Sequence, residues 1–233
     1  MSDILQNEIL KQVNELFRQA EEEERKCNWN KEIEILKKIE KISLDNKLKK
    51  IEGEIYFKLG EIYHIATHFE KTEVEVLKNY QLAISNFQKA HNTFEELKKE
   101  GYINASLGLI NLLKYISGSE EPEEEFLLES AKKYFNKAKL IYLEKGNSIL
   151  SLNMAILESR ALELIIGEKS IRVDEHSDFI KLASEFKNLT TKLIARSVHQ
   201  PDFSEIYYFY LGLSIVEFFT WSVFSLSIED LKI

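Results

Sequence analysis

The strongest constraint on the fold is an internal repeat. Two segments carry the same small and aromatic residues at the same spacing, 48 positions apart: Gly60, Ala83, Phe87 and Ala90 in the first, and Gly108, Ala131, Phe135 and Ala138 in the second. Such self-similarity is typical of repeat architectures, in which each unit buries its apolar face against its neighbours. Small residues let two helices approach closely, and the phenylalanine fills the space beside them. The repeat predicts an all-α protein, an α-solenoid of antiparallel helix hairpins.

Apolar residues recur at steps of three and four along most of the chain, which is the period of an amphipathic helix. Only 8 Gly and 2 Pro interrupt this pattern. We therefore expect about nine helices, over residues 3–26, 29–42, 49–70, 74–99, 102–117, 122–145, 147–166, 178–197 and 201–227.

Several local features refine this expectation. Residues 21–26 are all charged and are expected to protrude. The second helix should bury the face of Ile33, Leu36, Ile39 and Ile42. Gly101 and Gly146 are predicted to close the helices that precede them in the left-handed conformation.

At the repeated positions the chain resembles the tetratricopeptide repeat family, whose unit is two antiparallel helices. Leu59-Gly60 and Leu107-Gly108 are similar to the signature of its first helix, and the Ala, Phe and Ala sets to that of its second. The family's usual unit has about 34 residues. The spacing from the glycine to the first alanine is 23 residues in both copies, about eleven more than the short unit allows. Eleven residues are close to three helical turns, so the longer helices would keep the same face pointing inward.

The resemblance implies one tetratricopeptide-like domain over residues 1–233, of a divergent type with long helices. It divides into an N-terminal hairpin (1–46), two clear repeats (47–146) and a degenerate repeat with an apolar terminal helix (147–233). A compact helical bundle, in which the matching alanines are ordinary core positions, is the alternative.

Composition argues against several classes of function. A net charge of −8 with only five scattered arginines disfavours a nucleic-acid surface and a phosphate pocket. The chain has no Gly-rich phosphate loop, no His-Glu-x-x-His and no nucleophile elbow, so we expect no cofactor and no enzymatic activity. Cys27 stands alone and is expected to be a half-buried packing residue. With no signal segment before the first helix, we expect a cytoplasmic protein.

One set of residues has the spacing of a metal site. Glu61, His64 and His68 lie at i, i+3 and i+7 and would share a helix face. Di-iron carboxylate proteins need a second Glu-x-x-His and two further glutamates, and no second copy is present. A solvated or peptide-contacting pair is therefore the favoured interpretation, and no metal is expected.

The resemblance also implies a concave groove lined by the first helix of each hairpin. At the positions where the family binds a terminal carboxylate, this chain has Phe57, Glu61, Ala105 and Leu109, so that binding mode is not expected. We predict instead a groove for an amphipathic helix or extended peptide. Its expected lining is Glu54, Phe57, Lys58, Glu61, His64, Tyr102 and Ser106, although the apolar members could equally be core.

The last expected helix is unusually apolar, with Glu217 as the only charge between residues 206 and 226. A helix that is apolar all round is normally buried on all sides. We expect it to pack against a further element or a second copy of the chain, because polar residues and the absence of a flanking basic cluster argue against membrane insertion. The candidate association surface is Tyr208, Phe209, Phe218, Phe219, Trp221 and Phe224.

Three functions remain open from the sequence. The preferred hypothesis is an interaction module that binds a protein or peptide in the groove. The second is a homodimeric structural or adaptor protein that associates through the aromatic C-terminal helix. The third is a helical metal enzyme centred on Glu61, His64 and His68.

Overall fold

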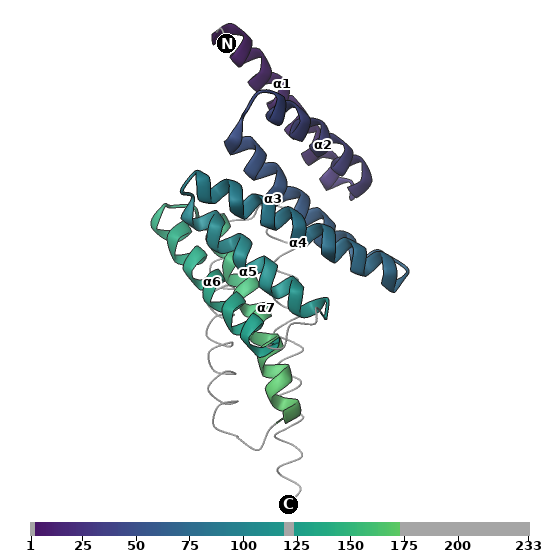
Figure 1. Ribbon diagram of the computed structural model, residues 1–233, viewed down its shortest axis with the longest axis vertical. Coiled ribbons are helices and arrows are strands. Elements are labelled where there is room, and N and C mark those ends of the chain that lie inside the picture. The colour runs from purple at the N-terminus through teal and green to yellow at the C-terminus, as the bar shows by residue number, and fades with distance from the viewer. Residues whose placement is uncertain (1–2, 119–123, 173–233) are drawn as a thin grey trace, which may run out of the picture. The chain divides into compact units, whose positions relative to one another are not determined.

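A computed structural model describes residues 3–118 and 124–172, and this part of the chain is all helical, with no strand. Its helices are α1 (Asp3–Arg25), α2 (Trp29–Asp45), α3 (Lys49–Ala66), α4 (Glu73–Glu96), α5 (Glu100–Ile116), α6 (Glu124–Glu144) and α7 (Ser148–Arg172) (Figure 1). They correspond to the first seven expected helices, which confirms the all-α prediction. The expected helices at 178–197 and 201–227 lie outside the described residues.

The chain forms two compact units, Met1–Leu127 and Leu128–Ile233, with the boundary inside α6. In the first unit, successive helices from α1 to α5 pack against one another in chain order (Figure 1). Its N-terminal core is shared by the first three helices and consists of Val13, Ala20, Ile35, Leu36, Ile39, Ile55, Leu59 and Ile62. None of the described helices has an apolar stretch long enough to cross a membrane.

Two glycines of α3 determine how closely it approaches α4. A Cβ atom at Gly60 would lie 2.8 Å from the ring of Phe87, and one at Gly53 would lie 2.9 Å from the ring of Phe94. Gly60 lies seven residues after Gly53 on α3, and its partner Phe87 lies seven residues before Phe94 on α4, as antiparallel packing requires. Both rings are fully buried. The sequence analysis identified Gly60 as a contact point but not Gly53, although Gly101 stands 48 positions after Gly53.

In the second unit, the residues of the second repeat copy that fall on α6 are also in the interior. Ala131, Phe135 and Ala138 have no exposed surface. The burial predicted from the repeat is therefore seen for these three positions and for Ala83, Phe87 and Ala90 on α4.

One helix-ending turn occurs four times, at residues 23–28, 43–48, 94–99 and 142–147. In each of these six-residue segments, the N–H of the sixth residue donates to the carbonyl oxygen of the first residue at 2.8–2.9 Å. The N–H of the fifth residue donates to the carbonyl oxygen of the second residue. The fifth residue is left-handed, with φ between 53° and 71°: Cys27, Lys47, Lys98 and Gly146. This is the Schellman motif. It confirms the prediction for Gly146 and shows that Cys27 is an exposed turn residue, in contrast to the expected packing role.

The prediction for Gly101 was wrong. Lys98 takes the left-handed position, and Gly101 is a buried residue in the first turn of α5. The backbone bond from Lys99 N–H to the Phe94 carbonyl oxygen, at 2.9 Å, already ends α4 at Glu96. The turn is therefore complete before Gly101 is reached.

Two helix ends also differ from expectation. α3 ends at Ala66, not near residue 70, because the Thr67 hydroxyl bonds to the His64 carbonyl oxygen at 2.6 Å and i→i+3 bonds close the last turn. α7 continues through Gly167 to Arg172. A single helical glycine costs only about 1 kcal/mol, which neighbouring helix formers can offset.

We expect Gly60→Ala to lower the free energy of unfolding by about 1–3 kcal/mol, because its Cβ would overlap the Phe87 ring. Denaturant unfolding measures this change. Adding Phe87→Leu should recover part of the loss, as a double-mutant cycle would show. A gain in stability for Gly60→Ala alone would contradict the close contact.

Replacing a left-handed lysine by glycine should stabilise the fold. We expect Lys98→Gly to raise the free energy of unfolding by about 0.5–1 kcal/mol, since φ near 53° is unfavourable for a residue with a Cβ. Lys98→Ala removes the same charge but keeps the Cβ, and is the matched control. Equal effects of the two substitutions, measured by denaturant unfolding, would contradict the left-handed assignment.

Candidate functional site

Four of the seven predicted groove residues lie on one side of α3. Glu54, Lys58, Glu61 and His64 follow one another at steps of four and three residues, and all four are half-buried. We call this set the α3 face. Intermediate exposure of charged side chains means that they are partly desolvated yet still reachable, and this combination is typical of binding surfaces.

The other three predicted residues lie deeper or to one side. Phe57 is buried against the rings of Phe87 and Tyr102, at centroid distances of 5.3 and 5.7 Å, and Ser106 is fully buried. Half-buried Tyr102 links α5 to α3 through Phe57 and to α4 through Phe94, on which it stacks at 4.4 Å. Phe57 and Ser106 therefore lie beneath the surface. For Phe57 this agrees with the alternative that the apolar members of the groove belong to the core.

The α3 face is tied to α1 by an ion pair. The Lys58 Nζ atom donates to Glu24 Oε2 at 2.9 Å, and the two side chains remain 32% and 40% exposed. Glu24 belongs to the charged end of α1, which was expected to protrude. That expectation was wrong for this side of the helix, since Glu23 is buried and Glu24 contacts α3.

Behind this pair lies Glu32, which sequence reasoning missed. Its side chain is 0% exposed, and neither carboxylate oxygen has a hydrogen-bond partner. The buried face of α2 includes Glu32, Leu36 and Ile39, whereas Ile33 is only half-buried. The signal was present, because Glu32 stands four residues before Leu36 and seven before Ile39, on the same helical face.

Glu24, Glu32, Lys58 and Glu61 interact electrostatically and form what we call the acidic cluster. Burial, and to a smaller extent the charge of Glu24, raises the pKa of Glu32 to about 7 against the opposing effect of Lys58. Burial likewise raises the pKa of Glu61 to about 7, although Lys58 favours its ionised form. Lys58 itself loses solvation, but the carboxylates of Glu61 and Glu24 outweigh that loss and raise its pKa. One ammonium group thus faces three carboxyl groups.

Other buried carboxylates in the described residues show how the fold usually accommodates such groups. Besides Glu32, three glutamates are buried, and each has a cationic partner at 3.3 Å or less. These pairs are Glu23 with Lys26, Glu52 with Lys49, and Glu158 with Lys139; Asn28 and Asn136 donate further hydrogen bonds to Glu23 and Glu158. Because buried charges are normally paired, Glu32 is the exception among the four.

The structure does not assemble the candidate metal site. His68 lies beyond the end of α3, with its ring centroid 5.8 Å from that of His64. Within residues 3–118 and 124–172, no three His, Cys, Asp or Glu side chains are placed to hold a metal ion.

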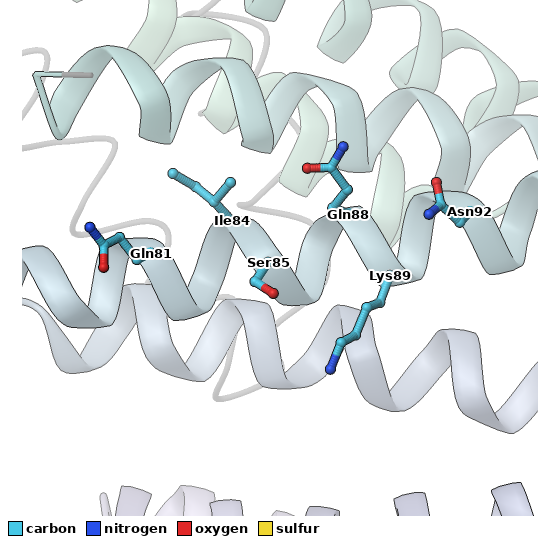
Figure 2. Close-up of a pocket in the computed structure, with 6 residues that line it drawn as sticks. All are labelled: Gln81, Ile84, Ser85, Gln88, Lys89 and Asn92. Carbon is cyan, nitrogen blue, oxygen red and sulfur yellow. The ribbon is translucent and has the colours of Figure 1, made fainter. Parts of the chain in front are cut away.

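The outer side of α4 carries a shallow hollow lined by Gln81, Ile84, Ser85, Gln88, Lys89 and Asn92 (Figure 2). An α-helix turns by about 100° per residue, which places these residues on the side of α4 opposite its buried face. Most of them are exposed. Lys89 extends toward α3, where its Nζ lies 5.1 Å from the centre of the Tyr56 ring. The hollow is a solvated polar helix surface with no buried functional group lining it.

No protein-family model matches the chain, and a search of curated proteins gave no match. The predicted association surface from Tyr208 to Phe224 lies outside the described residues.

The pKa of Glu32 gives a stability prediction with a definite sign. Because the folded pKa is raised from 4.5 to about 7, the folded state holds the proton more tightly, and the free energy of unfolding falls as pH rises from 4.5 through 7. Glu32→Gln should match the wild type near pH 5 and exceed it at pH 8 by as much as ~3 kcal/mol. Urea unfolding at several pH values measures the difference.

The matched control is Glu34→Gln, which removes the same charge from an exposed position of α2. Its difference from the wild type should be small and change little with pH. A Glu32→Gln variant that is less stable than the wild type at pH 8 would contradict a buried, unpaired carboxylate.

Proposed function

We propose that the chain is a cytoplasmic protein-interaction module of the α-solenoid type, which binds a peptide or helix of another protein on the α3 face. The observation that supports it most is the acidic cluster. Its charged groups are partly desolvated and come from three different helices. One of them, Glu32, has no hydrogen-bond partner among the residues that the structure describes.

The solenoid arrangement is proposed on two grounds. The 48-residue sequence repeat coincides with the spacing of the left-handed turn residues Lys98 and Gly146. The same turn also joins α1 to α2 and α2 to α3. A fold that reuses one turn between successive helices favours stacking of similar units, including the expected eighth and ninth helices.

Tyr102 adds an apolar and aromatic border to the charged surface. Burial raises the pKa of its hydroxyl, and the nearby charges of Glu54 and Glu61 raise it further. An amphipathic helix or an extended peptide could place apolar side chains beside Tyr102 and polar ones over the carboxylates. This combination supports a protein ligand.

Selection from a displayed random-peptide library tests this function directly. We expect enriched peptides that slow amide hydrogen exchange in α3 and α5 and leave the outer side of α4 unchanged. Protection confined to the hollow around Gln88, or no enriched peptide at all, would contradict the proposal.

A further inference from the structure

The acidic cluster contains more negative charge than the protein itself compensates. Lys58 is the only cation among its four members, and its ammonium is already hydrogen-bonded to Glu24 at 2.9 Å. Both oxygens of Glu32 lack a hydrogen-bond partner. Glu61, on the next turn of α3, makes no hydrogen bond or ion pair with the described residues. One ammonium group is therefore shared by three carboxyl groups.

Leaving a carboxylate in this state is costly. A buried charge without a partner is destabilising by several kcal/mol, and proteins normally neutralise it with a cation or a proton. The protein does supply cations to Glu23, Glu52 and Glu158. Among the buried glutamates of the described residues, Glu32 alone has no such cation, and it lies next to the half-buried pair of Glu24 and Lys58. A cation from outside could therefore reach the cluster from this side.

We propose that the acidic cluster receives a basic side chain, arginine in preference to lysine, from a partner protein. This inference rests on the proposed function and specifies the chemistry of the partner. A guanidinium is planar, sheds water more readily than an ammonium, and can contact two carboxylates at once. The charges of Glu54 and Glu61 also act on the half-buried Tyr102, which places an aromatic side chain beside the carboxylates.

A bound metal ion is the competing occupant, and the geometry disfavours it. Metal sites need three or more converging ligands, and the described residues contain no such group. Lys58 would also repel a divalent ion about twice as strongly as a single positive charge at the same place. A long side chain can instead insert a single positive charge between Glu61 and the Lys58–Glu24 pair.

The proposal predicts a definite coupling to protons. Near neutral pH the carboxyl groups of Glu32 and Glu61 are partly protonated, because burial raises the pKa of each to about 7. A cation favours their ionised forms, so its binding releases protons. Affinity for a basic peptide should therefore rise from pH 6 to pH 8.

The test uses three synthetic amphipathic peptides of about 18 residues, five helical turns, with one shared Leu- and Phe-rich face. Two positions on the polar face carry arginine, neutral citrulline or glutamate. Fluorescence anisotropy with the full chain in ~0.1 M salt should show the arginine peptide binding at least about tenfold more tightly than the citrulline peptide, and the glutamate peptide most weakly. A lysine version should fall between arginine and citrulline.

Variants assign the effect to the cluster. Glu61→Gln should remove most of the arginine preference, and Glu61→Lys should reverse it in favour of the glutamate peptide. Glu34→Gln, the exposed control of equal charge, should leave the preference unchanged. Circular dichroism melting checks that each variant is folded. Glu24→Gln, at the exposed edge of the cluster, provides a second variant if Glu61→Lys does not fold.

Each contrary outcome has a distinct meaning. If all three peptides bind equally well, the basic side-chain inference fails and the proposed function stands. If Glu61→Gln and Glu34→Gln weaken binding alike, the preference reflects overall charge and the inference fails. Displacement of the arginine peptide by micromolar Ca²⁺ or Mg²⁺ would replace the inference with a metal site. If no peptide binds, the inference fails, and the library selection decides separately whether the proposed function also fails.

Discussion

The close contact between α3 and α4 is the constraint on which the candidate site depends. Gly53 and Gly60 leave no space between the α3 backbone and the rings of Phe94 and Phe87. Since interiors are close-packed, this contact fixes α3 in both rotation and register. The opposite side of the same helix packs Ile55, Leu59 and Ile62 into the core shared with α1 and α2. Lys58 lies beside these residues, where it reaches Glu24 of α1.

The acidic cluster is arranged by that position of α3. Lys58 pairs with Glu24 at the end of α1, while Glu32 lies buried in the first turn of α2. The partial positive charge at that helix end offsets only part of the cost of a buried carboxylate. Real proteins break local rules mainly at functional or strained sites. Glu32 breaks the pairing rule that the other buried glutamates obey, which is why the cluster supports the functional proposal.

Much of the fold could be predicted from the sequence, because helical periodicity and the repeated small residues report directly on burial. The seven described helices were expected within a few residues, and the repeat identified Gly60 and its aromatic neighbour Phe87. The turns could not be read in the same way, because three of the five left-handed positions in the described residues are Cys27, Lys47 and Lys98, where no glycine marks the turn. For the site, the family resemblance placed Glu54, Lys58, Glu61 and His64 in one groove. Helical spacing could have placed Glu32 on the buried face of α2. It could not show that Glu32 lacks a hydrogen-bond partner, because that depends on packing across three helices.

The proposed function depends on Glu32 being a buried carboxyl group with no hydrogen-bond partner among the described residues. The most direct measurement is a ¹³C NMR titration of the glutamate side-chain carboxyl carbons in the full chain, with Glu32 assigned through Glu32→Gln. We expect a pKa of about 7 for Glu32. A Glu32 carboxyl that titrates at its ordinary value near 4.5 would show that it is solvated or paired, and would contradict the account.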